Sequence, residues 1–359
     1  MKRISYQLLA GLTLCGLFSF CLATDSFAGW KELKQLPTHR WGLEIAAVGT
    51  KVYAIGGQDD TPEIHKNEEY DIEKDSWVEK KPIPTGRVRH AAVSVDGKVY
   101  VIGGTRDGIA PLAAVEMYDP KTDKWSKKAD MPTPRIAPVT VVLAGKIYTI
   151  GGATDVFFPS PAIEVYNPVT DTWEKKKDMP NPRWGAAGAA MPPSKIYIFG
   201  GATDFTHQES TTEVDEYDTK TETWTPKAKI QRPVHNFGAA FVNSGKIYVM
   251  GGEKFKGKGG LKGGPNDPEL VFYQDVWEYS PEENKYRRMP HMPTPRGSFG
   301  IAVADGKIYT IGGWNGGAGS NERENEAYQP PGWPFPKKFS VDPRGKLAIK
   351  WGALKAHSR

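Results

Sequence analysis

The chain has 359 residues, enough for one large domain or two ordinary ones, and it is rich in Gly (39), Pro (29), Tyr (15) and Trp (11). This composition is typical of many short strands joined by tight turns. The formal net charge of +5 is small for this length and argues against nucleic acid as a partner.

The first predicted element is a secretory signal peptide at residues 1–28. Lys2 and Arg3 are followed by a mostly apolar run at 8–22 and by small residues before Gly29. The run is shorter than the ~20 residues of a membrane helix, so a cleaved signal is favoured over an anchor. Both cysteines lie inside this segment, which leaves the mature chain without disulfides, thiolate ligands or a cysteine nucleophile. We therefore expect a secreted or periplasmic protein.

A repeat begins after this segment. A Gly-Gly pair recurs six times, with a period near 47–50 residues in most of the chain. In five repeats a Tyr precedes an aromatic residue by seven positions, and in four an Arg follows that aromatic residue by ten. The pairs are Gly56-Gly57, Gly103-Gly104, Gly151-Gly152, Gly200-Gly201, Gly251-Gly252 and Gly312-Gly313. A repeat of this length indicates a solenoid or a propeller.

Each repeat can be interpreted as four strands, and the third one shows the pattern well. Its strands are predicted at 139–142, 147–150, 162–166 and 172–175. A hairpin centred on Val169-Thr170 places Tyr166 opposite Trp173, and such aromatic pairs stabilise neighbouring strands. Gly-Gly at the end of the second strand is interpreted as a packing feature, because no Gly-Lys-Ser/Thr phosphate loop is present.

The segment "GGTRDGIAPLAAVEMYDPKTDKW" at 103–125 resembles the Kelch motif, and the likeness extends from Trp30 to about Tyr328. The resemblance implies an all-β fold, a six-bladed β-propeller at 29–335. The stretch 30–40, "WKELKQLPTHR", matches "WSKKADMPTPR" at 125–135. We therefore expect the N-terminal strand to complete the last blade and to close the ring beside Tyr328.

The repeated Arg is expected to pair with a carboxylate two positions before the repeat Tyr, since a buried unpaired Arg is costly. The fifth repeat departs from this pattern, because Trp277 replaces the carboxylate. Its Arg position is ambiguous, since Arg232 follows Trp224 by eight residues instead of ten, whereas a count back from Gly245 puts His235 there. It also carries a Gly-rich, basic insertion at 253–274, interpreted as a mobile flap or a disordered excursion. The C-terminal extension at 336–359 is basic and is interpreted as a segment lying on the propeller, a frayed end or a docking segment.

Antiparallel strand order predicts that the residues after each repeat Arg share one rim with the loops after each Gly-Gly. Aromatic faces with convergent Asp, Asn and Arg side chains suit a sugar, a peptide or another polar ligand. Each candidate also has an alternative interpretation as an ordinary loop residue. The candidates are Trp41, Arg89, His90, Arg106, Asp155, Phe157, Trp184, Asp204, His235, Asn236, Trp314 and Asn315. No metal and no cofactor are expected, because no His-x-x-x-His pair is present.

These features favour a secreted, non-catalytic binding propeller, a monomer without a membrane span, that holds a protein or glycan on the rim. The alternative is an enzyme resembling the periplasmic sialic-acid mutarotases, which are six-bladed Kelch proteins. Anomerisation needs a general acid and base, for which Asp155, Asp204, His90, Arg89 and His235 are candidates. Galactose-oxidase-like chemistry is excluded because the mature chain has no Cys. A ubiquitin-ligase adaptor or an actin crosslinker fits poorly with a signal peptide and with no second domain before the propeller.

Overall fold

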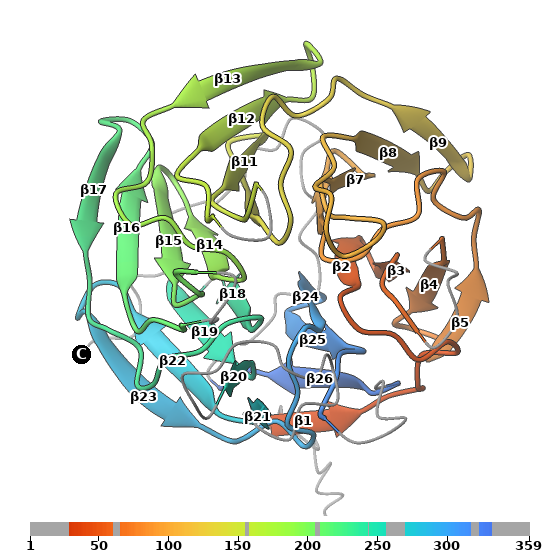
Figure 1. The fold of residues 1–359 in the computed structure, drawn as a ribbon. Helices are drawn as coiled ribbons and strands as arrows, with labels where there is room; N and C mark the ends of the chain where they lie inside the picture. Colours follow the sequence, from red (N-terminus) through yellow and green to blue (C-terminus); the bar gives the residue numbers. More distant parts are fainter. Residues whose placement is uncertain are drawn as a thin grey trace, which may run out of the picture.

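The computed structural model describes residues 29–59, 65–154, 158–204, 209–242, 244–255, 270–316 and 323–331. These residues form six four-stranded antiparallel sheets, one two-stranded sheet and no helix. Figure 1 shows the six sheets arranged as blades around a central axis, which confirms the predicted six-bladed propeller. The described part of the chain contains no helix that is long and apolar enough to cross a bilayer.

The blades are numbered in chain order, and in blades 1–5 the strands run outward from the axis in sequence. Blade 1 contains β2 (Glu44–Val48), β3 (Lys51–Ile55), β4 (Asn67–Asp71) and β5 (Ser76–Glu79). Blade 2 contains β6 (Ala91–Val95), β7 (Lys98–Ile102), β8 (Val115–Asp119) and β9 (Lys124–Lys127). Blade 3 contains β10 (Val139–Leu143), β11 (Lys146–Ile150), β12 (Ile163–Asn167) and β13 (Thr172–Lys176). Blade 4 contains β14 (Ala187–Met191), β15 (Lys195–Phe199), β16 (Val214–Asp218) and β17 (Thr223–Pro226). Blade 5 contains β18 (Gly238–Val242), β19 (Lys246–Met250), β22 (Val276–Ser280) and β23 (Lys285–Met289), and blade 6 contains β24 (Gly300–Ala304), β25 (Lys307–Ile311), β26 (Asn325–Gln329) and β1 (Gly29–Glu32).

The ring closes as the sequence predicts. Strand β1 pairs antiparallel with β26, and Trp30 lies opposite Tyr328 with 5.1 Å between the ring centroids. The Trp30 indole donates a hydrogen bond to the Pro290 carbonyl of blade 5. The first strand of the described chain therefore joins the last blade and also contacts the blade before it (Figure 1).

The seven-residue aromatic spacing has the predicted register, with Tyr166 opposite Trp173. The equivalent aromatic pair recurs in every blade, as Tyr–Trp in five and as Tyr279–Tyr286 in blade 5, with centroids 4.8–5.1 Å apart. The Tyr166 hydroxyl donates to Asp171 in the turn, and the Trp173 indole donates to the Ala129 carbonyl of blade 2. Because Asp171 also accepts the Ala129 N–H, one hairpin fixes its own turn and the neighbouring blade. Apolar clusters fill the space between adjacent sheets, for example where β10 and β11 face β15.

The five repeat arginines pair with carboxylates of the same blade, which confirms the predicted ion pairs. The pairs are Arg40–Glu68, Arg87–Glu116, Arg135–Glu164, Arg183–Asp215 and Arg296–Glu326. Each of these arginines is at most 1% exposed. In blade 3, Arg135 also donates to the carbonyl oxygens of Gly151 and Ala162, at 3.3 and 2.8 Å. The Arg and the Gly-Gly thus belong to one structural unit.

Blade 5 lacks this unit, and the predicted position of His235 in it is wrong. Gly201 N donates to Val234 O where Gly152 N donates to Arg183 O, so Val234 holds the Arg position. Val234 follows Trp224 by ten residues, the usual spacing, whereas the count back from Gly245 was misled by a longer hairpin turn. Both members of the ion pair are therefore replaced together, by Val234 and Trp277.

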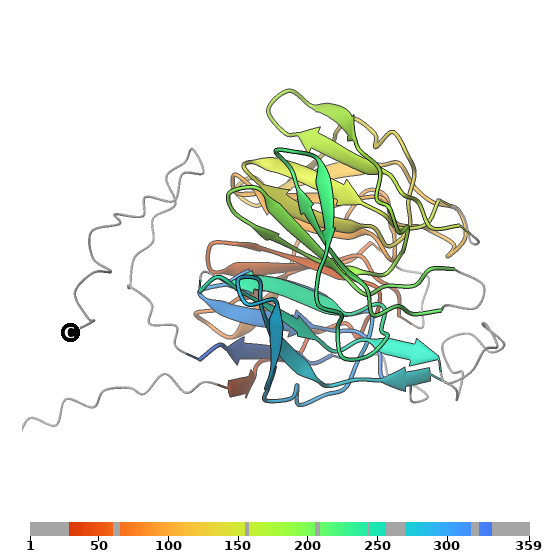
Figure 2. The same cartoon turned by 90° about the vertical axis from the view of Figure 1, so that its left-hand side faces the viewer.

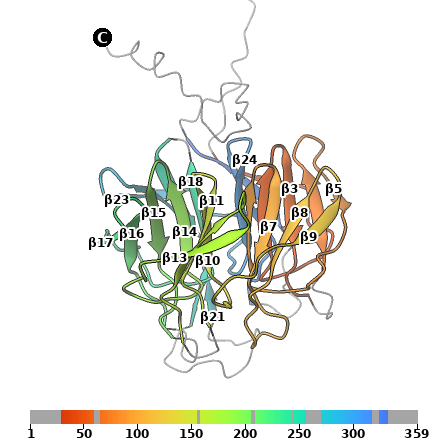
Figure 3. The same cartoon turned by 90° about the horizontal axis from the view of Figure 1, so that it is seen from above.

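The predicted loop insertion at 253–274 is partly ordered as strands, which corrects the expectation of a loop throughout. Strand β20 (Glu253–Phe255) pairs with β21 (Leu270–Phe272), and Glu253 lies opposite Phe272. Figures 2 and 3 show this hairpin projecting from one face of the disc, while β1 begins on the opposite face. The intervening residues 256–269, the signal segment 1–28 and the extension 336–359 lie outside the described residues.

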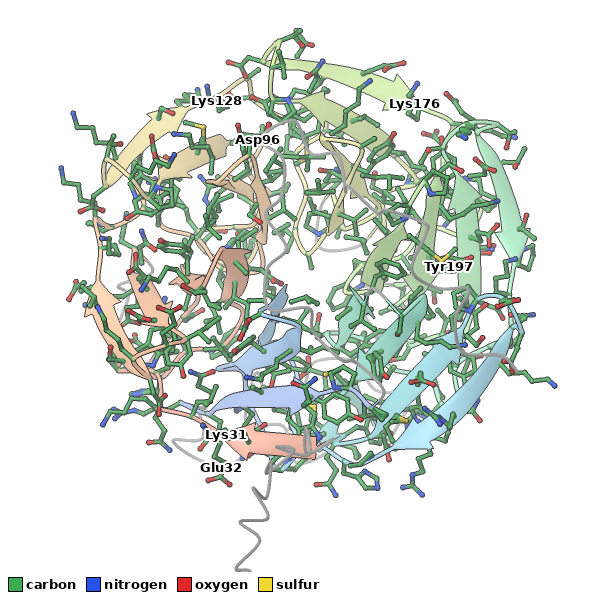
Figure 4. All side chains as sticks on the ribbon, turned by 180° about the vertical axis from the view of Figure 1, so that it is seen from behind. Lys31, Glu32, Asp96, Lys128, Lys176 and Tyr197 are labelled. Carbon is green, nitrogen blue, oxygen red and sulfur yellow. The ribbon has the colours of Figure 1, made fainter. Side chains whose placement is uncertain are left out.

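Charged side chains gather on the circumference of the disc. Figure 4 shows Lys31 and Glu32 of β1, and Lys176 of β13, at its outer edge. Tyr197 of β15 is 1% exposed and lies within the sheet layers. The outer strands are therefore exposed to solvent. Polar side chains that face the axis are the unusual ones.

Candidate functional site

A closed ring of six backbone hydrogen bonds surrounds one end of the central channel. One residue from the entry to each innermost strand donates its N–H to the carbonyl of the same position in an adjacent blade, with N···O distances of 2.7–3.2 Å. The ring residues are Gly42, Arg89, Ala137, Gly185, Asn236 and Ser298. All six have positive φ, from +46 to +60°, which is unusual for the four that are not glycine.

An isolated antiparallel β-bridge next to each ring residue positions it. The residue after the repeat Arg position pairs with the residue after Gly-Gly, and the ring residue follows directly. The six pairs are Trp41–Gln58, Val88–Thr105, Ile136–Ala153, Trp184–Ala202, His235–Glu253 and Gly297–Trp314. Glu253 is the one acidic residue among these twelve positions. The backbone of the mouth is therefore repeated six times, whereas its chemistry differs between blades.

A cavity of about 70 Å³ lies at this end of the channel. Its lining includes Arg89, Asn236 and Ser298 from the ring and Glu44 from β2. The other ring positions are Gly or Ala. The polar residues that line this cavity therefore come from blades 1, 2, 5 and 6.

Arg89 has no ion pair and no side-chain hydrogen bond among the residues that the structure describes, and its Nε atom is buried. Its guanidinium lies over the Trp41 ring, 5.3 Å from the centroid. Burial lowers the pKa of Arg89, an effect that the Glu253 carboxylate opposes. Cation–π contact does not satisfy the five N–H donors of a guanidinium, so Arg89 retains donor capacity toward the mouth.

Glu253 is 5% exposed and lies beside Arg89. Its Oε1 accepts a 2.6 Å hydrogen bond from Asn236 Nδ2, and the Ser298 hydroxyl also interacts with the carboxylate. Burial raises the pKa of Glu253 to about 7, which the hydrogen bond from Asn236, the charge of Arg89 and the Ser298 hydroxyl only partly offset. Near neutral pH this carboxyl group therefore exists in both protonation states.

Two glycines make room for these side chains. A Cβ on Gly297 would lie 2.4 Å from Glu253 Oε2, and a Cβ on Gly185 would lie 2.6 Å from Asn236 Oδ1. A Cβ at either position would force the side chain of Glu253 or Asn236 to move, so the carboxylate and amide lie directly over glycine backbone.

A second inward carboxylate, Glu44, lines the same cavity. Burial raises the pKa of Glu44 to about 8, opposed only weakly by a backbone N–H. At the corresponding position of the innermost strands the other blades carry Ala, Val or Gly. Glu44 therefore adds a proton-binding group to the channel.

Aromatic side chains border the mouth on blades 1, 5 and 6. Phe272 of the β20–β21 hairpin packs edge-on against Trp314, with centroids 5.1 Å apart, and Trp314 lies 6.5 Å from Trp41. We call Trp41, Trp314 and Phe272 the aromatic platform, in which Trp314 is only 6% exposed and supports the half-buried rings of Trp41 and Phe272. It adjoins the Arg89 guanidinium through Trp41.

The structure brings together four of the predicted site residues, Trp41, Arg89, Asn236 and Trp314, and Asn315 directly follows the last of these. Arg106 is exposed in the blade 2 loop, and Asp204 accepts a 3.0 Å hydrogen bond from the Trp184 indole through its carbonyl. Asp155 and Phe157 lie outside the described residues.

Three predicted ligand contacts are corrected by burial. Trp184 and His235 are 0% exposed, with rings 5.4 Å apart, and His90 is 2% exposed. Burial lowers the pKa of both histidines to about 3, so they are neutral at physiological pH. Trp184 and His235 support the mouth from within, whereas His90 lines the 70 Å³ cavity as a neutral side chain. The 3.7 Å approach of His235 Nε2 to Glu253 is accordingly no ion pair.

Sequence reasoning missed Glu253, Glu44 and Phe272. Glu253 was assigned to a loop, although the alignment of residues after Gly-Gly distinguishes it from Gln58, Thr105, Ala153, Ala202 and Trp314. Glu44 was detectable as the one charged residue at the start of an innermost strand. No sequence signal places Phe272 on Trp314. In the described part of the chain no cluster of three or more His, Cys, Asp or Glu residues is arranged to hold a metal ion.

Comparison with known proteins places this geometry in context. The family described as Attractin/LZTR1 β-propeller matches residues 17–322. Kelch-like protein 33 of Homo sapiens is 28% identical over 128 residues, which cover 36% of this chain and 21% of that protein. Kelch-like ECH-associated protein 1B of Danio rerio is 31% identical over 124 residues, which cover 34% of this chain and 19% of that protein. The matched part thus spans about a fifth of the length of these relatives.

A solved structure titled "Structure of YjhT" superposes with a TM-score of 0.70 and 20% identity. The superposition covers 82% of this chain and 95% of that chain. At this identity the likeness shows the shared fold.

Proposed function

Because the chain belongs to the Attractin/LZTR1 β-propeller family of Kelch-repeat proteins, we propose that it is a non-catalytic binding module. Its ligand, a protein or a glycan, is held on the rim around the mouth of the channel. Kelch propellers typically bind proteins, and loops on a rigid scaffold are the usual location of a binding site. Fold alone does not establish function, so the proposal depends on the chemistry of the mouth.

The aromatic platform is the observation that carries this proposal. Trp41, Trp314 and Phe272 come from three different blades, and Arg89 of a fourth blade lies over Trp41. Aromatic and Arg side chains dominate the binding energy of protein interfaces, and aromatic faces also pack against sugars. The hydrogen-bonded ring beneath the platform fixes its backbone, which reduces the entropy lost on binding.

Binding of the purified protein to glycan and peptide arrays, followed by titration of any ligand found, tests this function. We expect Trp41→Ala to weaken the best ligand at least tenfold, since a central Trp contributes about 2 kcal/mol or more to an interface. Phe272→Ala tests the same platform from blade 5. Val78→Ala, which removes an exposed apolar side chain from β5 on the circumference, is the matched control and should leave affinity unchanged. If neither platform variant changed the affinity for the ligand, this surface would be rejected as the binding site.

Export is part of the proposal. The signal-like segment 1–28 supports a secreted or periplasmic location, and the absence of Cys after residue 28 is compatible with it. Fractionation of expressing cells, with a version starting at Gly29 as the control, tests this point. Export of both versions, or of neither, would contradict a signal function for 1–28.

One observation favours a second function, a sugar mutarotase or epimerase. Glu253 has a pKa near 7 in a mouth that also contains Arg89, and a carboxyl group poised near the working pH suits acid–base catalysis. Anomerisation of N-acetylneuraminate followed by NMR decides between the two functions. Acceleration that Glu253→Gln abolishes would establish the enzyme, and an unchanged rate with the wild-type protein would exclude this substrate.

A further inference from the structure

We propose that the mouth of the channel is a site for one carboxylate group, in which Arg89 pairs with the carboxylate while Asn236 and Ser298 complete its hydrogen bonds. This inference deepens the proposed binding function and depends on the ligand approaching this rim. It identifies the chemical class of the ligand as a monocarboxylate, such as an acidic sugar or an acidic side chain.

The state of Arg89 is the first argument. The five repeat arginines are each paired with a carboxylate, whereas Arg89 has none among the described residues. Arg89 is half-buried with its Nε enclosed and without an anionic partner in the described part of the chain, and a carboxylate is the partner that matches its fork of donors. The Trp41 ring covers one face of the guanidinium, so the guanidinium edge is available to such a ligand.

The ring supplies the second argument. Arg89, Asn236 and Ser298 hold left-handed backbone conformations at +53, +50 and +53°. Strained conformations of this kind concentrate at functional sites. The cavity of about 70 Å³ has room for a group of carboxylate size or for a few water molecules, but not for a whole sugar ring. The remainder of a ligand would therefore extend outward over the aromatic platform.

Glu253 makes binding depend on pH. Glu253 lies outside the cavity lining but interacts with the charge of Arg89, so an ionised Glu253 competes with a bound carboxylate for Arg89, whereas a protonated Glu253 does not. The other titratable groups nearby are Glu44 and His90, which line the cavity, and His235; an ionised Glu44 also disfavours an anion, and both histidines are neutral above about pH 3. Affinity should therefore be highest below pH 7 and should fall as the pH rises through 7.

The charge balance excludes a dianion as the preferred ligand. The cavity lining contains one guanidinium, that of Arg89, and one carboxyl group, that of Glu44, and Arg89 also interacts with the Glu253 carboxyl group outside the lining. A phosphate monoester would bring up to two negative charges to a single cation. A monocarboxylate matches the single positive charge when Glu253 is protonated.

Calorimetric titration of the purified protein with D-glucuronate and D-glucose tests the proposal, because the two sugars differ in the carboxylate. At pH 6 we expect glucuronate to bind at least tenfold more tightly than glucose. Arg89→Gln should lower glucuronate affinity at least tenfold, and Arg89→Lys, which keeps the charge but loses the fork, should give an intermediate loss. Arg287→Gln, on the outer strand β23, is the charge-matched control. Thermal melting confirms that each variant is folded.

The pH dependence of glucuronate affinity gives the second readout. For wild type, affinity should fall about tenfold between pH 6 and pH 8, as expected when binding requires a group of pKa near 7 to be protonated. Glu253→Gln should keep the pH 6 affinity and lose this fall. A pH dependence removed by Glu44→Gln instead would overturn the role of Glu253.

Several results would overturn the carboxylate site itself. These are equal binding of glucose and glucuronate, tighter binding of inorganic phosphate than of glucuronate, or folded Arg89→Gln with wild-type affinity. The proposed function would survive these results if an array ligand still required Trp41. Conversely, glucuronate binding without any array ligand would support the carboxylate site and contradict the broader module.

Discussion

Replacing Arg135 with methionine removes one of the five buried guanidinium groups that connect the strands within a blade. Arg135 is fully buried and donates to the carbonyl oxygens of Thr133, Thr149, Gly151 and Ala162, at 2.8–3.3 Å. It also donates to Glu164 at 2.5 Å. Methionine fills a similar volume but satisfies none of these acceptors.

The expected loss of stability follows from the carboxylate that loses its partner. Glu164 is 1% exposed and keeps hydrogen bonds only from the Thr133 hydroxyl and N–H. Breaking a buried ion pair by removing one partner costs about 3–5 kcal/mol, because the remaining charge is buried and unpaired. For a domain of about 300 residues, this corresponds to a fall in melting temperature of roughly 5–8 °C.

Urea unfolding monitored by Trp fluorescence measures this cost, provided that the transition is two-state. The matched control is Lys127→Ala, which breaks an exposed pair with Asp130 and should cost less than about 0.5 kcal/mol. The double variant Arg135→Met with Glu164→Leu should recover most of the loss, because it leaves no buried charge. Blade 5 already shows such a joint replacement in Val234 and Trp277.

A loss below about 1 kcal/mol for Arg135→Met would refute this reasoning. So would a double variant whose cost equals the sum of the two single costs, because the partners would then act independently. In either case the guanidinium groups would be tolerated rather than stabilising elements of the blades.

Three further predictions concern the scaffold and the channel. Trp125→Phe keeps the ring packing but loses the 2.8 Å indole hydrogen bond to the neighbouring blade, and urea unfolding should show a loss of about 1 kcal/mol. Gly151→Ala places a Cβ 2.6 Å from a carbonyl oxygen at φ +62° and should lower the free energy of unfolding by at least about 2 kcal/mol. Gly145→Ala is the control: it has φ +75° but open space around the Cβ, and should lower the free energy of unfolding by about 1 kcal/mol from backbone strain alone. Because burial raises the pKa of Glu44 to about 8, folding favours its protonated form, and wild-type stability should fall as the pH rises from about 4.5 to 8. Glu44→Gln should reduce this fall, leaving the part that comes from Glu253, and should be more stable than wild type at pH 9 by roughly 1–3 kcal/mol; equal stability there would show that Glu44 ionises freely.

The scaffold was largely predictable because each of its parts is repeated. Tyr166 opposite Trp173, Arg135 beside Glu164, and Trp30 beside Tyr328 each follow from spacings that recur around the ring. A spacing that several blades share reflects a contact that every blade needs, and hairpin register converts it into a position.

The candidate site was less predictable, because it depends on where a side chain points within the rim. Trp184 and His235 lie in the predicted positions along the chain but face inward and are fully buried. Glu253 was missed because the insertion that follows it was interpreted as a loop, although the residue itself continues the repeat and pairs with His235. Burial and partnering are properties of neighbouring blades, and the residues of one repeat do not contain that information.

The position of the polar groups follows from a difference between backbone and side-chain symmetry. Six blades give the mouth an approximately sixfold backbone, since every ring residue makes the same hydrogen bond with the same left-handed φ. Positive φ favours glycine, yet only Gly42 and Gly185 are glycine, while Arg89, Asn236 and Ser298 keep side chains at this conformational cost. The ring alone does not require those side chains, because Gly and Ala serve in the other three blades. The cost is therefore explained by what Arg89, Asn236 and Ser298 contact in the mouth, and this is where recognition chemistry should be sought.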